Sequence, residues 1–256
     1  MILGLTWTSL RKITRSFFKN TLLPTVYPRH CPVCHRVLPL GSFICTPCEN
    51  LLPFVTEPFC CRCGKPVTDS RQEYCADCRR FPKSFHSGIA LWLYTSCTQP
   101  SMMAFKYNNR RCLSSFFIDE LLKKHRYTLL RWYPDAIVPV PVHRNRQKKR
   151  GYNQAELLAK DLSAALNLPC YPHLLLRILD TPPQKNYRPQ ARRKHMQNAF
   201  IINPRQVSLL ARLHTILLID DIYTTGATMD ACSRLLLSGG VKRVHICSLC
   251  IGLSVD

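Results

Sequence analysis

The sequence predicts an α/β fold in which a parallel sheet is flanked by helices and preceded by a small metal-binding domain. The first observation is a set of short apolar runs, such as residues 216–219, which are typical of strands buried on both faces. The second is that residues 31–78 carry four Cys-x-x-Cys pairs, a spacing typical of zinc ligands. A chain of 256 residues suits one α/β domain with a smaller domain ahead of it.

The composition points to phosphate-bearing partners. The formal charge is +21, and two zinc sites made of thiolates alone would lower it by about 4. A basic excess of this size favours nucleotides or nucleic acid as partners, although a solvated basic surface without a partner gives the same composition. Fifteen cysteines without a recognisable signal peptide at residues 1–10 predict a reducing, cytoplasmic location in which cysteines bind metal.

Residues 1–24 predict a separate amphipathic helix. Apolar residues recur at helical spacing from Leu3 through Trp7 to Phe17, and basic residues lie elsewhere around the wheel. Such a helix docks on its own protein or lies on an anionic membrane surface, and the sequence leaves both open. The second alternative would bring the protein to the inner face of the cytoplasmic membrane. No apolar run reaches the roughly 18 residues that a membrane span needs.

Residues 25–84 predict a double zinc ribbon. The first two Cys-x-x-Cys pairs are separated by ten residues and the last two by eleven, so one small unit is repeated. Two pairs supply four thiolates around one structural zinc ion, which leaves no open position for catalysis. Pairing the first with the second and the third with the fourth is simplest, and an interleaved arrangement is the alternative. The eight predicted ligands are Cys31, Cys34, Cys45, Cys48, Cys60, Cys63, Cys75 and Cys78.

Residues 85–256 predict the α/β domain, with about five strands. Strands are expected over residues 88–95, 136–142, 174–178, 216–219 and 241–251, and helices over 112–125, 152–166 and 229–237. Cys247 and Cys250 form one further Cys-x-x-Cys pair. They fall inside the last strand, where alternation directs them to opposite faces, so we expect them in the core.

A phosphate-sugar site is predicted where the strand over 216–219 ends. Asp220 and Asp221 follow the strand, and a turn of small and hydroxyl-bearing residues, 224–228, leads into a helix. Backbone amides and the helix dipole favour a phosphate dianion there, and Gly226 lets the backbone approach it closely. Because two carboxylates would repel phosphate, we expect them to accept hydrogen bonds from ribose hydroxyls. The simpler alternative is an ordinary strand–turn–helix with a solvated acidic pair.

A second anion site is predicted after the strand over 136–142. The run 143–150 holds five Lys or Arg in eight residues and precedes a helix. Cations at a strand end suit pyrophosphate at the carboxyl edge of a parallel sheet, since guanidinium groups bind phosphate oxygens bidentately. A merely soluble basic turn is the alternative.

The segment LLIDDIYTTGAT, residues 217–228, resembles the motif with which type I phosphoribosyltransferases bind 5-phosphoribosyl-1-pyrophosphate (PRPP). Residues 23–252 as a whole resemble the ComF family, which includes competence protein F and GntX-like proteins. This wider resemblance rests on the order of several motifs. They are the four Cys-x-x-Cys pairs, Phe105-Lys106-Tyr107, Val138-Pro139-Val140-Pro141, Arg150-Gly151-Tyr152-Asn153-Gln154, Gln184 with Arg192, Ala199-Phe200 and the acidic strand.

The resemblance implies a double zinc ribbon followed by a type I phosphoribosyltransferase-like domain that binds PRPP with Mg²⁺. It assigns the basic run to the pyrophosphate and residues 180–198 to a mobile hood over PRPP, in which His195 and Tyr187 depart from the family pattern. The candidate catalytic residues are Asp220, Asp221 and Arg192. The implied PRPP-binding residues are Lys106, Pro139, Val140, Arg144, Arg146, Arg150, Gln184, Arg192, Asp220, Asp221, Thr224, Thr225, Gly226, Ala227 and Thr228.

Two functions of different classes remain open. One, which the resemblance implies, is a PRPP-binding competence protein that handles single-stranded DNA in natural transformation, with a DNA-uptake helicase as partner. The alternative is an enzyme that transfers ribose 5-phosphate from PRPP to a nitrogen base or amine. Thr224 stands where 6-oxopurine phosphoribosyltransferases carry an aspartate general base, so that activity is not expected. The basic excess and the zinc ribbons favour DNA handling.

Overall fold

The computed structural model describes residues 29–180 and 198–253, and the chain divides into two compact units between Leu52 and Pro53. The predicted helix over residues 1–24 lies outside the described residues. In the first unit an antiparallel bridge joins His30 to Val37, and a short helix follows, α3 (Thr46–Glu49). The division leaves the second cysteine-rich repeat in one unit with the α/β domain, whereas the predicted boundary lies after residue 84.

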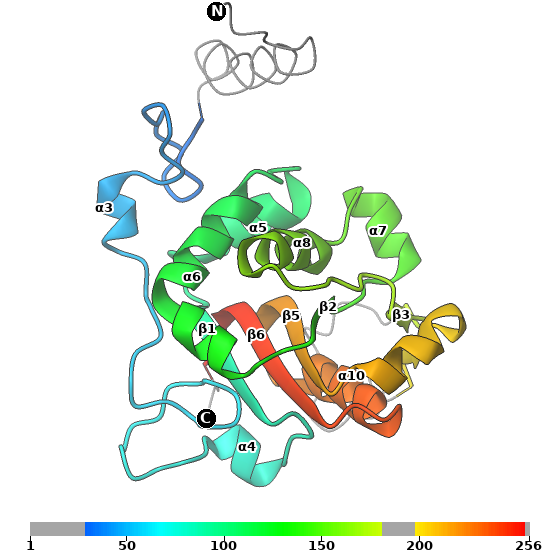
Figure 1. Ribbon diagram of the computed structural model, residues 1–256. Coiled ribbons are helices and arrows are strands. Elements are labelled where there is room, and N and C mark those ends of the chain that lie inside the picture. Colours follow the sequence, from blue (N-terminus) through cyan, green and yellow to red (C-terminus); the bar gives the residue numbers. More distant parts are fainter. Residues whose placement is uncertain (1–28, 181–197, 254–256) are drawn as a thin grey trace, which may run out of the picture. The chain divides into compact units, whose positions relative to one another are not determined.

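The second unit is built on a four-stranded parallel sheet (Figure 1). Its strands are β1 (Ser87–Leu93), β2 (Ala136–Pro139), β5 (Thr215–Tyr223) and β6 (Arg243–Ile251). They lie in the order β1-β6-β5-β2, so the last two strands of the chain form the middle of the sheet. Residues 216–219 of β5 are fully buried, as their apolar run predicts for a strand covered on both faces.

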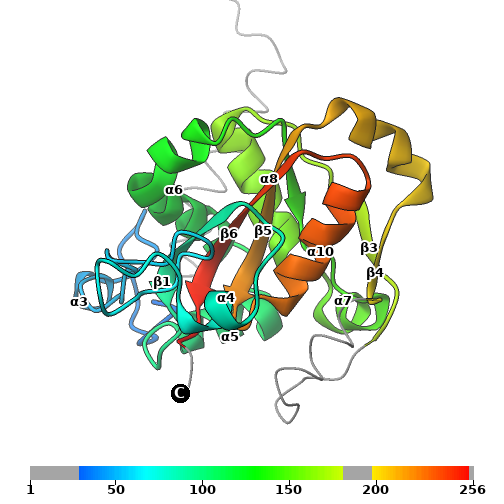
Figure 2. The same ribbon diagram turned by 90° about the horizontal axis from the view of Figure 1, so that it is seen from below.

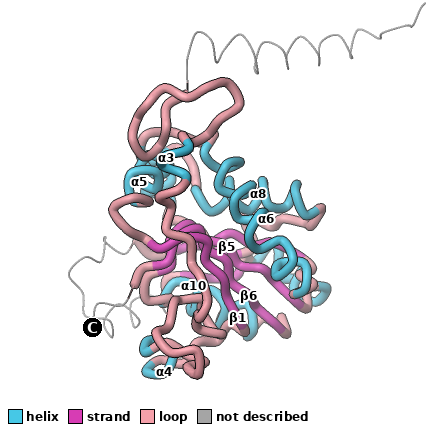
Figure 3. The backbone as a smooth tube through the Cα atoms, turned by 90° about the vertical axis from the view of Figure 1, so that its left-hand side faces the viewer, coloured by secondary structure: helices cyan, strands magenta, loops and turns pink. Residues whose placement is uncertain are grey.

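Helices cover the two faces of this sheet (Figures 2 and 3). α6 (Leu113–Arg131) and α8 (Gln154–Leu166) pack together on one face, and α10 (Ala227–Ser238) packs against β5 and β6 on the other. Two shorter helices follow β1 and β2, namely α5 (Gln99–Tyr107) and α7 (Arg144–Arg150). Among the described residues, none of the helices combines the length and apolar character needed to cross a bilayer.

Two further strands form a separate ladder. β3 (Leu175–Arg177) and β4 (Phe200–Ile202) pair antiparallel, and a 3₁₀ helix, η2 (Pro204–Arg212), follows. The strand predicted over 174–178 therefore exists, but β4, which the sequence did not predict, pairs with it in place of the main sheet. Among the described residues, no fifth strand joins the main sheet. One isolated bridge, between Ile137 of β2 and Cys170, lies where the fifth strand was expected.

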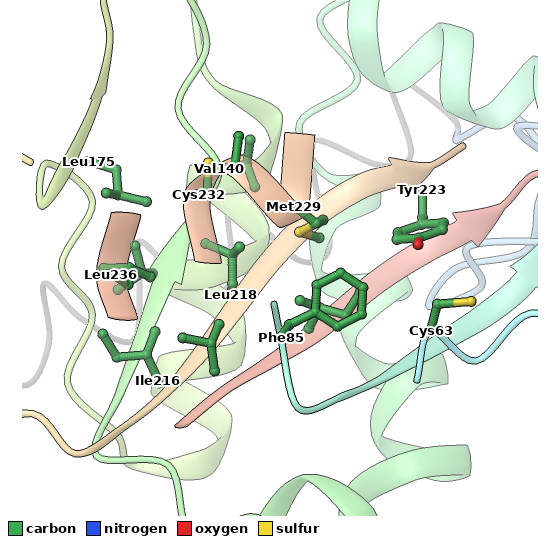
Figure 4. Close-up of a cluster of buried hydrophobic side chains, with 14 of the residues drawn as sticks. Cys63, Phe85, Val140, Leu175, Ile216, Leu218, Tyr223, Met229, Cys232 and Leu236 are labelled. Carbon is green, nitrogen blue, oxygen red and sulfur yellow. The ribbon is translucent and has the colours of Figure 1, made fainter. Parts of the chain in front are cut away.

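The second cysteine-rich repeat packs into the core of the second unit. The Val55 amide donates to the Leu91 carbonyl of β1 at 3.0 Å, and a short helix follows the third cysteine of the repeat, α4 (Ala76–Arg80). Its cysteines share one apolar cluster with the residues under β5 and α10. Figure 4 shows Cys63 and Phe85 beside Tyr223, the last residue of β5. This repeat is therefore built into the domain that carries the sheet.

Candidate functional site

The carboxyl ends of β2 and β5 form a switch point in the sheet. The two strands are parallel neighbours, with Pro139 in register with Ile219. The chain leaves β2 toward α8 on one face and leaves β5 toward α10 on the other. Loops that part in this way open a crevice at the carboxyl edge, where open α/β sheets bind their ligands. Both predicted anion sites lie at this crevice.

The β5–α10 turn has the geometry of a phosphate loop. Gly226 precedes α10 with a φ of 73°, in the left-handed region that glycine adopts freely. A Cβ at this position would overlap the Tyr223 hydroxyl. Thr224 is exposed, Thr225 is half-buried and Thr228 lies in the first turn of α10. Because the first amides of α10 have no partner within the helix, the turn suits a phosphate group.

The acidic pair at the end of β5 belongs to a largely buried charged cluster. Lys106 of α5 places Nζ 3.0 Å from Asp221 Oδ2, with 17% and 10% of the two side chains exposed. Burial would lower the pKa of Lys106, but the charge and hydrogen bond of Asp221 raise it overall. Burial and the charge of Asp221 raise the pKa of Asp220 to about 7. The two carboxylates are therefore largely buried, and Asp221 is ion-paired, so the alternative of an ordinary solvated acidic pair is wrong.

A segment after the second cysteine-rich repeat supports the turn. Lys83 Nζ donates to the Thr225 carbonyl at 2.9 Å, and the Ser84 amide donates to Asp230 Oδ1 at 2.7 Å. The other oxygen of Asp230 pairs with Arg234, one turn further along α10, at 2.5 Å. Lys83 is only 7% exposed. The sequence did not identify it, because a lone lysine outside any motif gives no signal.

The predicted basic run forms α7 beside the crevice. His143 caps the helix by accepting a hydrogen bond from the Asn145 amide at 3.3 Å. Asn145 Nδ2 donates to Asp180 Oδ2 at 2.9 Å, and Arg146 Nε lies 3.6 Å from Asp180 Oδ1. Arg144 is exposed and Arg146 half-buried. The first residue of the predicted hood is thus attached to the helix that carries the predicted pyrophosphate ligands.

Two motifs of the resemblance, 47 residues apart in the chain, contact each other. The Tyr152 hydroxyl donates to the Phe105 carbonyl, and Gln154 Nε2 donates to the Lys106 carbonyl at 3.4 Å. Arg150 Nη1 donates to Gln154 Oε1 at 3.0 Å. These contacts fix the end of α5 against the start of α8 and so position Lys106 for its ion pair with the acidic strand.

Asn153 joins the β2 loop to α8. Its Oδ1 caps the helix by accepting from the Ala155 amide at 3.1 Å, and its Nδ2 donates to the Val140 carbonyl at 3.2 Å. The Val140 amide donates to the Ile219 carbonyl at 2.9 Å. Pro139 and Val140 are both buried. Their position makes them backbone supports of the crevice, since buried apolar side chains cannot bind phosphate.

Arg177, at the end of β3, is a further cation near the crevice that sequence reasoning missed. Burial and the charge of Arg146 lower its pKa, while the charges of Asp220 and Asp180 act in the opposite direction. The Arg177 guanidinium is therefore close enough to interact electrostatically with charged groups of both predicted anion sites. A single arginine in a three-residue strand carries no pattern by which the sequence could have identified it.

The eight predicted metal ligands form two clusters, and in each the four Sγ atoms lie within 4.8 Å of one another. Sγ–Sγ distances are 3.6 Å between Cys34 and Cys45, and 3.7 Å between Cys63 and Cys75. Four thiolates at about 2.3 Å from a tetrahedral zinc ion lie roughly 3.8 Å apart. Each cluster thus fits one structural zinc ion that would supply folding energy. The simple pairing holds, with Cys31, Cys34, Cys45 and Cys48 in one cluster and Cys60, Cys63, Cys75 and Cys78 in the other.

Two predicted site residues, Gln184 and Arg192, lie outside the described residues. The other predicted PRPP residues come from three segments at the carboxyl edge: the end of α5, the β2–α7 segment and the β5–α10 segment. Cys247 and Cys250 are fully buried in β6, as expected for core residues.

Comparison with known proteins identifies a zinc ribbon part and a phosphoribosyl transferase part. Residues 22–79 match the model of the double zinc ribbon domain, and residues 152–254 match that of the phosphoribosyl transferase domain. The chain is 29% identical to competence protein F of Haemophilus influenzae, over 80% of this chain and 89% of that protein. It is 29% identical to the DNA utilization protein YhgH of Escherichia coli, over 87% and 97%. Competence protein ComFC of Bacillus subtilis is 28% identical, over 77% and 79%. These matches confirm the resemblance predicted from the sequence motifs.

Proposed function

We propose that this homologue of competence protein F, which has a double zinc ribbon and a phosphoribosyl transferase domain, binds PRPP and handles single-stranded DNA. The names of its relatives, competence protein and DNA utilization protein, support the DNA part. On this proposal the protein serves natural transformation. It would act in the cytoplasm, at the inner face of the membrane, with a DNA-uptake helicase as its partner.

The observation that carries the PRPP part is the meeting of two loops of opposite charge at one switch point. The amides at the start of α10 suit the 5-phosphate of PRPP, and Asp220 and Asp221 can accept hydrogen bonds from ribose hydroxyls. The cations of α7 suit the pyrophosphate. Mg²⁺ would bind mainly through pyrophosphate and ribose oxygens, since the ion prefers substrate phosphates to a cage built of protein alone.

Lys106 would connect the ribose and pyrophosphate parts of this site. Its ammonium group has three donors, so it can keep its ion pair with Asp221 and still contact a ligand oxygen. The ion pair also holds the Asp221 carboxylate in one orientation, 3.0 Å from Nζ. A ribose hydroxyl would then meet an acceptor that is already positioned, which lowers the entropy cost of binding.

The charge balance supports the DNA part. Residues 139–200 hold twelve Lys or Arg against three acids, a net charge of +9. One pyrophosphate cannot use all of these cations. We expect the surplus to contact a nucleic acid backbone without sequence preference, so the affinity for single-stranded DNA should fall with salt by roughly 0.7 in log–log slope per phosphate neutralised.

The PRPP proposal is tested with the variant Asp220→Asn/Asp221→Asn. It should abolish the PRPP-dependent rise in melting temperature, measured with Mg²⁺ by scanning fluorimetry, because the ribose hydroxyls lose charged acceptors. Asp119→Asn, which changes an exposed side chain on α6, is the matched control and should keep the rise. The basal melting temperature should also drop, since Lys106 loses its partner, so each variant is compared with its own ligand-free sample. An unchanged rise in the double variant would place the site elsewhere.

A second measurement separates binding from turnover. The wild-type protein is incubated with PRPP, Mg²⁺ and a panel of nucleobases, and released pyrophosphate is quantified. We expect no base-dependent release. Release with one base or amine would establish the alternative function, transfer of ribose 5-phosphate to that acceptor, and would leave the PRPP site as described.

A further inference from the structure

A second cleft, of about 650 Å³, lies at the amino edge of the sheet, opposite the PRPP crevice. It is formed where β1, β5 and β6 begin, at Ser87, Thr215 and Arg243. The last turn of α6 and the knuckle that holds Arg62 in the second cysteine-rich repeat complete its walls. We call it the amino-edge cleft. None of the motifs used above to place PRPP contributes to it.

The amino-edge cleft is strongly basic. Arg62, Arg131 and Arg243 line it, and the latter two are exposed. Arg62 is held in place because its Nη1 donates to the Phe85 carbonyl at 2.7 Å. Among the described residues that line the cleft there is no Asp or Glu. One exposed carboxylate lies beside the cleft, because Asp135 Oδ2 accepts a hydrogen bond from the Thr215 amide at 2.8 Å. The three guanidinium groups outnumber it and favour a ligand with several phosphates.

Exposed aromatic rings accompany these arginines. Tyr133 is 82% exposed, although a tyrosine ring is usually at least half-buried, and its φ of 48° lies in the left-handed region. Tyr74 is 36% exposed, and the guanidinium of Arg62 lies 5.9 Å from its ring centroid. Tyr133 directly follows Trp132, the C-cap of α6, and helices commonly end with a left-handed residue at this position. Its exposed ring lines the cleft and is accessible to a ligand.

The floor of the cleft is also aromatic. The Trp132 and His245 rings stack at 4.5 Å with an angle of 11°. His245 Nδ1 lies 2.8 Å from Ser87 Oγ, which fixes the ring. Burial, followed by the charges of His86 and Arg243, lowers the pKa of His245 to about 4. The buried ring is therefore neutral at pH 7 and adds no charge to the floor of the cleft.

We propose that the amino-edge cleft binds single-stranded DNA, with a base stacked on Tyr133 or Tyr74 and the backbone phosphates paired with Arg131, Arg243 and Arg62. Alternating aromatic faces and cations are how proteins bind single strands without reading their sequence. A duplex does not offer its base faces, so it could use only the charges. This inference rests on the proposed DNA-handling function and adds a binding site for the strand besides the surplus cations of residues 139–200.

The position of the cleft makes it independent of PRPP. β5 runs from Thr215, at the cleft, to Tyr223, at the phosphate turn. A nine-residue strand spans roughly 26 Å at about 3.3 Å per residue, so PRPP cannot touch the nucleotides held in the cleft. The two ligands should therefore bind together, whereas a strand bound along α7 would compete with PRPP for the same cations.

The test is the anisotropy of a labelled thymidine 20-mer at several salt concentrations. Arg131→Gln/Tyr133→Ala is the cleft variant. Arg126→Gln/Tyr127→Ala is the matched control, because it removes the same two residue types from exposed positions of α6 outside the cleft. We expect the cleft variant to lose affinity about 5- to 150-fold, from one stacked base, and to reduce the salt slope by about 0.7. The control should bind like the wild type.

Two further measurements complete the test. The loss of affinity in the cleft variant should be the same with and without saturating PRPP, and a 5-iododeoxyuridine 20-mer should cross-link to the peptide that contains Tyr133 or Tyr74. If the protein binds the 20-mer but the cleft variant equals the control, or if PRPP removes the difference between them, the cleft inference is wrong and the proposed function stands. If the wild type does not bind the 20-mer at all, the DNA-handling function fails and the inference fails with it. A normal PRPP-dependent thermal shift in the cleft variant shows that it is folded.

Discussion

The two cysteine-rich repeats have nearly the same spacing but different surroundings. In the first, Cys34 is exposed and Cys45 partly exposed, and the repeat belongs to the unit that ends at Leu52. In the second, all four thiols are buried, and the unit that holds them also holds the parallel sheet. The same cysteine spacing therefore occurs in two settings. The first repeat belongs to a separate unit organised by its metal, and the second is part of the core of the α/β unit.

The difference lies in contacts that the second repeat makes outside its metal cluster. A Cβ on Gly64, in its first knuckle, would lie 2.8 Å from the Gly88 carbonyl oxygen, so this knuckle touches the backbone of β1. At the other end Lys83 holds the β5–α10 turn through the Thr225 carbonyl. Metal binding in the second repeat is thus expected to support the proposed PRPP site, and metal binding in the first is not.

The largest expected effect separates the two metal clusters. Wild-type protein should contain two zinc ions per chain, and Cys45→Ser and Cys63→Ser should each lose one, measured by elemental analysis. Structural zinc contributes on the order of 10 kcal/mol to the folding of its cluster. Cys63→Ser should therefore remove the main thermal transition and the PRPP-dependent shift, whereas Cys45→Ser should keep both.

The matched control for this prediction is Cys61→Ser. Cys61 is an exposed thiol in the same knuckle as Cys63, outside the cluster of four. It should keep two zinc ions and the wild-type transition. Equal effects of Cys45→Ser and Cys63→Ser on the main transition would contradict the distinction drawn between the repeats, and so would one zinc ion per wild-type chain.

A smaller effect is expected from Lys83→Met, which breaks the link between the second repeat and the turn while it keeps the length of the side chain. The half-buried carbonyl of Thr225 loses a charged donor, which costs about 1–3 kcal/mol. If the turn is the PRPP site, PRPP affinity measured by calorimetry should fall about 5- to 150-fold with both zinc ions retained. Lys124→Met, at an exposed position of α6 outside the proposed site, is the matched control and should leave the affinity unchanged. Unchanged affinity in Lys83→Met would show that the turn does not depend on the repeat.

The smallest expected effect uses pH. The pKa of Asp220 is raised from 3.8 to about 7 in the folded protein, so the folded state holds a proton that the unfolded state releases. This contribution to stability is complete below about pH 4 and is lost as pH rises through 7. Asp220→Asn should therefore have a flatter melting profile between pH 5.5 and 7.5 than the wild type. Zinc retention by the first repeat should instead increase as pH rises, because its thiols must deprotonate to bind metal. A wild-type profile as flat as that of the variant would contradict the raised pKa.

The sequence predicts those parts of the fold that depend on local pattern. The strand–turn–helix over residues 216–237 follows from an apolar run, two acids and a glycine that the turn needs, and the metal clusters follow from cysteine spacing. What it could not predict depends on contacts between distant segments. β3 has the composition of any short strand, and its partner β4 lies beyond residues 181–197. Lys83 and Arg177 are single cations whose environment only the fold creates.

During synthesis, the thiols of the second repeat are accessible to metal before the segments that bury them have been made. Lys83 and its partner Thr225 are 142 residues apart, so at about 5–20 residues per second the repeat emerges roughly 7–30 s before β5 and α10 exist. In that interval its thiols can meet metal from solution. Once β5 and α10 are in place, Cys60 and Cys63 are 0% and 1% exposed. Zinc in the second repeat should then leave only as fast as the domain opens, whereas a chelator can reach the first repeat through its exposed Cys34.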